Sequence, residues 1–320
     1  SSRDHKIAQL RMADSETGEV RDVFAEESAT YFESGFSDAN WRVLPSENTF
    51  IWFSEKDNWG HLYLHDLSNG ELKLKLTDGN WRVLDVVNLD HDNRKIYFTG
   101  SNLEEGDPYF QYLYSIGFDG GDLVNLTSEP ANHRIDWSES KQYFVDSYST
   151  PVDAGAVVVK DTSGAVVMEL ETPDMSPLLD SGWVPPEQIV VKARDQLTDI
   201  YGLLYKPSNF DSRRQYPIRN YLYPGPQSGS VGTRSFVTAR GDKQAIAELG
   251  FIVVEVDAMG TPGRSKEFHD AYYGNMGDNG LPDQIAAIRQ LANDRSHMDI
   301  DSVGIWGHSG GGYASTAGIL

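Results

Sequence analysis

Near its C-terminal end the chain reads Val303-Gly304-Ile305-Trp306-Gly307-His308-Ser309-Gly310-Gly311, and a run of small, helix-compatible residues follows. The apolar run predicts a strand. Gly-x-Ser-x-Gly predicts the sharp strand-to-helix turn called a nucleophile elbow, on which the serine hydroxyl stands exposed above a sheet. Glycine is needed beside the serine because the chain turns so tightly there. The motif therefore predicts an α/β-hydrolase with Ser309 as nucleophile.

The partners of this serine are missing from the sequence. A serine nucleophile needs a histidine base that a carboxylate orients, and in α/β-hydrolases both follow the serine along the chain. Eleven residues follow Ser309, and none is acidic or histidine. We therefore expect a fragment of a serine hydrolase, truncated after the elbow and inactive as it stands.

Upstream of the elbow, strands and helices alternate. This alternation predicts a largely parallel sheet with covering helices. The expected strands are 187–191, 201–205, 219–223, 251–256 and 303–306, and the expected helices are 243–249 and 282–293.

The front of the chain repeats a different pattern. Two short strands at 50–54 and 61–65 recur at 95–99 and 112–116, with further copies near 7–12 and 142–145. A period of 46 to 47 positions, with short strands and polar turns, is typical of β-propeller blades. A β-sandwich is the alternative, but a sandwich has no reason to repeat at this length.

These patterns divide the chain into a partial β-propeller of three to four blades (1–180), a linker (181–186) and the N-terminal part of a hydrolase domain (187–320). The linker contains Pro185 and Pro186, which prevent regular strand pairing. Because propellers close with about four to eight blades, we expect the chain to be truncated at its front as well.

Composition narrows the possible partners. The net charge of −21 over 320 residues disfavours nucleic acids and anionic membranes, which are polyanions. Without cysteine, disulfides and thiolate metal sites are excluded. No metal cluster or phosphate loop is visible in the sequence, so no cofactor is expected. We favour a periplasmic or secreted location over a cytoplasmic one.

Several segments together resemble the prolyl oligopeptidase family of serine peptidases, and within it the dipeptidyl peptidase IV-like branch. They are Gly60–Tyr63, Leu76–Trp81, Leu203–Phe210, Tyr223–Pro226, Gly250–Val254, Asp283–Ile285 and the elbow. The resemblance implies a peptidase that acts on short peptides and needs no cofactor. Members of this family are often homodimers, but the sequence leaves the oligomeric state open.

The resemblance also assigns an oxyanion hole, which needs two donors aimed at the oxygen that becomes charged. One donor is the backbone N–H of Gly310, the residue after the nucleophile. The other is a tyrosine hydroxyl in a Tyr-x-Gly-Pro context, which Tyr223 matches. The alternative for Tyr223 is an ordinary half-buried strand tyrosine.

For four other polar residues the sequence predicts structural roles. His308 neighbours Ser309 and should point away from it, into a packing or pocket-wall position. Asp257 precedes the serine in sequence and should cap a turn with Gly260. Glu26 and Glu27 should form a solvated face, because the glutamate pair of this branch belongs to an earlier part of its propeller.

Two positions depart from the branch. Gly310 stands where a tyrosine commonly walls the proline pocket, which leaves preference for proline open. Met259 stands where the family has an arginine, and Arg264 could partly replace it.

We therefore predict a dipeptidyl aminopeptidase. An esterase or acylaminoacyl-type hydrolase is the alternative on the same scaffold, and a non-catalytic propeller binding module is a second.

Overall fold

The computed structural model describes residues 1–35 and 38–320. Its N-terminal half consists of antiparallel sheets that follow one another along the chain. The first is the hairpin of β1 (Ile7–Ala13) and β2 (Val20–Glu27), and three four-stranded sheets follow. Their strands are β3 (Arg42–Leu44), β4 (Thr49–Ser54), β5 (His61–Asp66) and β6 (Leu72–Lys75); β7 (Arg82–Asp90), β8 (Lys95–Ser101), β9 (Gln111–Gly117) and β10 (Val124–Asn125); and β11 (Asn132–Trp137), β12 (Tyr143–Thr150), β13 (Asp153–Asp161) and β14 (Val166–Glu171).

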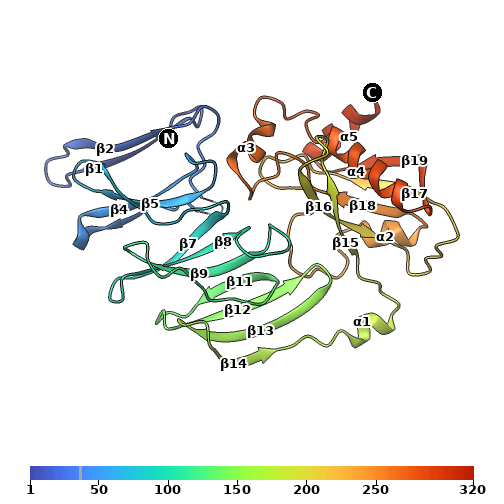
Figure 1. Cartoon of the computed structure of the whole chain (residues 1–320), viewed down its shortest axis with the longest axis horizontal. Helices are drawn as coiled ribbons and strands as arrows, with labels where there is room; N and C mark the ends of the chain where they lie inside the picture. Colours follow the sequence, from blue (N-terminus) through green and yellow to red (C-terminus); the bar gives the residue numbers. More distant parts are fainter. Residues whose placement is uncertain (36–37) are drawn as a thin grey trace.

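Apolar clusters join each sheet to the next. Phe50 and Trp52 pack against the hairpin, and Phe53 and Phe98 share one cluster between the next two sheets. Phe144 of β12 closes a third cluster with side chains of β8 and β9. The sheets thus form an arc, as Figure 1 shows. This arrangement confirms a partial β-propeller and rules out the sandwich alternative, in which two sheets would share a single core.

The repeated segments occupy equivalent places. Segments 50–54 and 95–99 fall on β4 and β8, the second strands of their sheets, and 61–65 and 112–116 fall on β5 and β9, the third strands. The sequence repeat therefore reflects a repeat of blades.

The C-terminal half has one mixed sheet in the order β15-β16-β18-β17-β19. The hairpin of β15 (Glu187–Lys192) and β16 (Asp199–Tyr205) lies at one edge, and its strand β16 pairs antiparallel with β18 (Ile252–Val256). β17 (Tyr216–Tyr221) runs parallel to both β18 and β19 (Met298–Trp306). This is the expected partial α/β-hydrolase sheet, with β17 beginning and ending before the predicted 219–223.

Short helices complete this half. They are α2 (Lys243–Glu248), α3 (Lys266–His269), α4 (Leu281–Asp294) and α5 (Gly310–Ile319), with the 3₁₀ turn η2 (Asp270–Tyr272). A helix α1 (Ser176–Asp180) precedes β15, and the 3₁₀ turn η1 (Pro45–Glu47) lies in the propeller between β3 and β4. α4 buries Ala287, Ile288 and Leu291 in the core of the sheet. None of the helices in the described residues has the length and apolar character needed to cross a bilayer.

Candidate active site

Ser309 lies between the end of β19 and the start of α5. Its backbone has φ 51° and ψ −116°, a conformation that side-chain-bearing residues seldom adopt, and its side chain is exposed. Such backbone strain persists only where the surrounding structure enforces it, and it is concentrated at functional sites. The structure therefore places Ser309 on a strained, exposed elbow.

Two glycines allow the elbow to form. A Cβ atom on Gly307 would lie 2.4 Å from the carbonyl oxygen of Leu222, and one on Gly311 would lie 2.3 Å from the same oxygen. Real Cβ atoms do not approach an oxygen so closely. The Gly-x-Ser-x-Gly pattern is thus required by the backbone that follows β17.

The first turn of α5 supplies a backbone donor beside the serine. Gly311 N–H donates to His308 O at 2.7 Å, and Tyr313 N–H donates to Ser309 O at 3.1 Å. Within the described residues, no hydrogen bond uses the N–H of Gly310. This N–H is one of the unpaired donors that every helix start presents.

Tyr223 reaches the same place from the neighbouring strand. β17 and β19 are parallel and in register at Tyr221 and Trp306, so the residues just beyond them meet at one sheet edge. A Cβ on Gly310 would lie 4.0 Å from Cζ of Tyr223. The Tyr223 hydroxyl accepts a hydrogen bond from Gln227 Nε2 at 2.8 Å, which leaves its own proton free to donate.

Structural roles are predicted for two further residues, His308 and Asp257. His308 is exposed rather than packed, and among the described residues its ring makes no hydrogen bond to Ser309. Asp257 does not cap a turn with Gly260, because its carboxylate binds Arg234 and the N–H of Val231. Asp257 thus lacks the expected turn-capping role, whereas the pocket-wall position of His308 stays a prediction.

Glu26 and Glu27 differ from each other. Glu27 is exposed, as expected. Glu26 is partly buried and accepts hydrogen bonds from the Trp52 indole at 2.9 Å and the Ser54 hydroxyl at 2.6 Å. Burial raises the pKa of Glu26. The prediction of a solvated position is therefore wrong for Glu26, whose carboxylate links β2 to β4 by hydrogen bonds.

Arg264 is engaged within the fold. Its guanidinium donates to the carbonyl of Asp199 at 2.7 Å and lies 4.2 Å from the centre of the Phe268 ring. Nothing in these contacts supports Arg264 as the replacement for an arginine at position 259.

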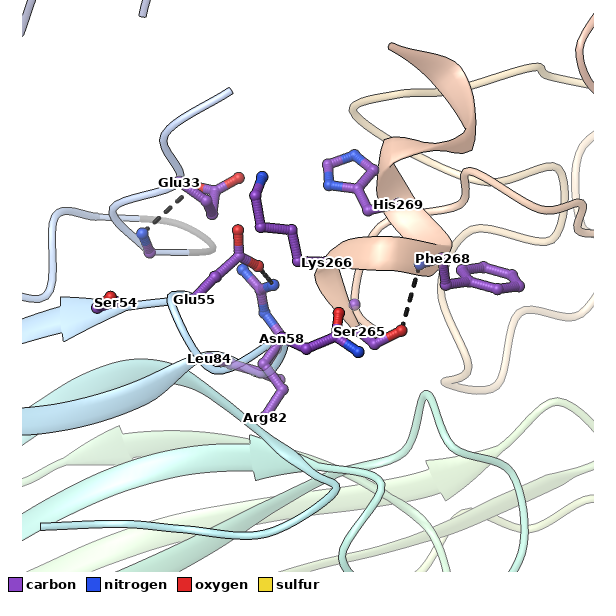
Figure 2. A network of polar contacts seen from close by, with 12 residues as sticks. Glu33, Ser54, Glu55, Asn58, Arg82, Leu84, Ser265, Lys266, Phe268 and His269 are labelled. Carbon is purple, nitrogen blue, oxygen red and sulfur yellow. Dashed lines mark hydrogen bonds and ion pairs between the residues drawn. The ribbon is translucent and has the colours of Figure 1, made fainter. Parts of the chain in front are cut away.

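A cavity of about 580 Å³ opens where the propeller faces α3. Its polar lining includes Glu33 and Arg82 from the propeller and Gln227 and His269 from the hydrolase half. Figure 2 shows Glu33 and Arg82 facing Lys266 and His269 across this gap. Because Gln227 also holds the Tyr223 hydroxyl, the wall of the cavity reaches the candidate oxyanion hole.

Some charged side chains in this region form ion pairs and others do not. Arg82 binds Glu55, and Lys266 lies 3.2 Å from Asp270. The Glu33 carboxylate accepts only from the N–H groups of Ser34 and Gly35 within the described residues. Burial raises the pKa of Glu33, and the positive charge of Arg82 only partly opposes this. Within the described residues the Glu33 carboxylate thus forms no direct ion pair, although Arg82 lies near enough for its charge to act on it.

Sequence reasoning missed Glu33, Arg82 and Gln227. Each is an ordinary polar residue in a turn or at a strand end, and no local motif marks it. The one available signal was the position of Gln227 directly after the Tyr223–Pro226 segment.

Comparisons with known proteins agree with this architecture. Residues 1–154 match the model of the dipeptidyl peptidase IV (DPP IV) N-terminal region, and residues 238–319 match that of the prolyl oligopeptidase family. The chain belongs to the prolyl oligopeptidase family, in its dipeptidyl peptidase IV-like branch.

Relatives in this family are longer proteins. Dipeptidyl peptidase 8 of Homo sapiens is 27% identical over 78% of this chain, and that of Mus musculus is also 27% identical over 78%. The chain spans 28% and 29% of their lengths. The crystal structure of dipeptidyl peptidase 4 from Porphyromonas gingivalis has the same fold, with a TM-score of 0.85 and 24% identity over 99% of this chain and 44% of that one.

A second polar cluster in this family member lies far along the propeller. Glu129, His133 and Asp146 lie close enough to share a metal ion. However, Lys160 Nζ lies 2.9 Å from Glu129 and 3.0 Å from Asp146. Burial alone would lower the pKa of Lys160, but the hydrogen bonds to both carboxylates outweigh burial and raise it. The lysine ammonium thus takes the place that a metal ion would need.

The close approach to Leu222 O predicts different effects of alanine at two adjacent glycines. Gly311→Ala should lower the unfolding temperature of the full-length protein, because the new Cβ would force the helix away from Leu222. Gly312→Ala is the matched control, since its Cβ would lie 3.4 Å from the nearest atom. That change should be neutral or slightly stabilising, because alanine favours a helix over glycine by about 0.5–1 kcal/mol. Equal unfolding temperatures for the two variants in scanning fluorimetry would contradict the steric role of Gly311.

Proposed function

We propose that the protein carrying this chain is a serine dipeptidyl aminopeptidase that forms an acyl-enzyme on Ser309. The observation that supports this most is the strained, exposed Ser309, with the N–H of Gly310 and the Tyr223 hydroxyl at the same sheet edge. Peptidase relatives in the same branch add independent support.

In the proposed reaction the hydroxyl of Ser309 attacks the scissile carbonyl. Gly310 N–H and the Tyr223 hydroxyl then donate to the oxygen that becomes negative, where fixed donors stabilise the transition state most. The proton of Ser309 passes to a histidine and from there to the leaving amine. We place this histidine and its acid outside residues 1–320, because among the described residues no histidine bonds to Ser309 and the relatives are several times longer.

The remaining assignments stay predictions. They are the division into a propeller (1–180), linker (181–186) and hydrolase part (187–320), and a periplasmic or secreted location. Preference for proline is left open, since Gly310 presents no side chain to a substrate. The esterase and binding-module alternatives have less support, because the named relatives are dipeptidyl peptidases.

A fluorophosphonate probe tests whether Ser309 is activated. The full-length wild type should be labelled, and Ser309→Ala should not, because the probe reacts only with a serine whose proton a base removes. Ser315→Ala is a matched control in the same helix and should label as wild type does. Folded wild-type protein that stays unlabelled would refute the hydrolase.

Tyr223→Phe tests the second oxyanion donor. In the full-length enzyme, kcat should fall by about 10²–10³-fold while KM changes little, as when one oxyanion donor is removed. Tyr221→Phe, on the last residue of β17, controls for loss of a tyrosine hydroxyl near the site. Steady-state kinetics on a dipeptide amide measures both, and equal kcat values for the two variants would exclude the role of Tyr223.

The cavity supports recognition of a free N-terminus. The Glu33 carboxylate on its wall is partly desolvated and forms no direct ion pair within the described residues, so a substrate ammonium would bind it directly. An ester or N-acylated substrate offers no such charge. The cavity therefore favours an aminopeptidase over an acylaminoacyl hydrolase.

Glu33→Gln tests this recognition. KM for peptides with a free amino group should rise by about tenfold, a loss of ~1.4 kcal/mol of binding, with little change for an N-acylated peptide. Glu71→Gln, an exposed glutamate on the propeller, is the charge-matched control. An equal change in KM for both substrates would show that Glu33 does not bind the ammonium group.

A further inference from the structure

A buried arginine, Arg234, joins the two halves of the molecule. The Arg234 side chain is 3% exposed. Its Nε donates to Asp107 of the β8–β9 loop at 2.9 Å, and its terminal nitrogen lies 2.6 Å from Asp257 at the end of β18. One guanidinium therefore binds a carboxylate from the propeller and another from the hydrolase sheet.

The propeller loop is organised around this contact. Asp107 uses its other oxygen to accept from the N–H of Tyr109 at 3.0 Å. The Tyr109 ring then packs on the guanidinium, 4.5 Å from its centre. A buried charge needs such complete pairing, because removing one partner leaves the other uncompensated. The position of Arg234 thus depends on the propeller as well as on the hydrolase.

From Asp257 the contacts lead to Tyr223. The second oxygen of Asp257 accepts from the N–H of Val231 at 3.1 Å. A Cβ on Gly229 would lie 2.1 Å from that oxygen, so the chain passes directly over the carboxylate. The adjacent Ser230 hydroxyl accepts from the N–H of Tyr223 at 3.0 Å.

We propose that Asp107 and Arg234 are positioning residues, through which the propeller holds the Tyr223 hydroxyl in its place for catalysis. The contacts lead from Asp107 through Arg234, Asp257 and the 229–231 segment to Tyr223. This inference rests on the proposed role of Tyr223. A propeller in such an enzyme would then do more than limit access, because it would fix one donor of the oxyanion hole.

The chemistry explains why a small change at Asp107 matters. Oxyanion donors act only at hydrogen-bond distance from the developing charge, and a displacement of about 1 Å can reduce a rate by about 10²-fold. Asp107→Asn keeps the shape of the side chain and removes its charge. The guanidinium then moves toward Asp257 alone, and the 229–231 segment follows.

A double-mutant cycle in the full-length enzyme tests the proposal. Asp107→Asn should lower kcat by about tenfold with KM nearly unchanged, a part of what one oxyanion donor contributes. In a Tyr223→Phe background the same change should lower kcat less than about twofold, because no hydroxyl remains to be misplaced. Thr30→Val is the matched control. It removes another hydrogen bond between the halves, from Thr30 to Asp270 at 2.7 Å, and its effect should be the same in both backgrounds.

The outcomes separate the proposals. An equal loss from Asp107→Asn in both backgrounds, or no loss in either, would overturn the positioning role while leaving Ser309 and Tyr223 as proposed. A Tyr223→Phe variant with wild-type kcat would instead refute the role of Tyr223 itself. If Asp107→Asn does not fold, Asp107→Glu keeps the charge but shifts it by one methylene, and the same cycle applies.

Discussion

The carbonyl oxygen of Leu222 constrains the whole site. Gly307 and Gly311 both pass within a distance of it that excludes a side chain. The N–H of Leu222 donates to Trp306 O at 3.1 Å, which continues the pairing of β17 with β19 past the end of the ladder. Because Tyr223 follows Leu222 and Ser309 lies between the two glycines, this one close approach brings Ser309 and Tyr223 together.

Buried cations form a second constraint on a strongly acidic chain. Arg82 binds Glu55, Lys160 binds Glu129 and Asp146, and Arg234 binds Asp107 and Asp257. Each cation is nearly inaccessible to water, so its place is fixed by its carboxylates rather than by solvent. The first lies at the cavity between the halves, and Arg234 joins the halves directly. Charge pairing thus contributes to how the propeller meets the hydrolase half.

Much of this could be predicted from the sequence, because the signals were local. Strand periodicity and the blade repeat located β4, β5, β8 and β9, and Gly-x-Ser-x-Gly located the elbow. The cavity could not be predicted, since Glu33 and Gln227 lie about two hundred positions apart and only the tertiary fold brings them together. The errors at Asp257 and Glu26 have the same cause. Each carboxylate was assigned a local partner or solvent, whereas its real partners, Arg234 and Trp52, lie elsewhere in the sequence.

The three glycines of the elbow do not have the same reason to be glycine. A Cβ on Gly310 would meet only Pro224 Cγ at 3.5 Å and Tyr223 Cζ at 4.0 Å, which are ordinary contacts. Its φ is not positive either, unlike that of Ser309. The fold would therefore accept a side chain at position 310, so the geometry of the turn does not explain the absence of one. With glycine at this position, no side chain from residue 310 covers Pro224 or the Tyr223 ring.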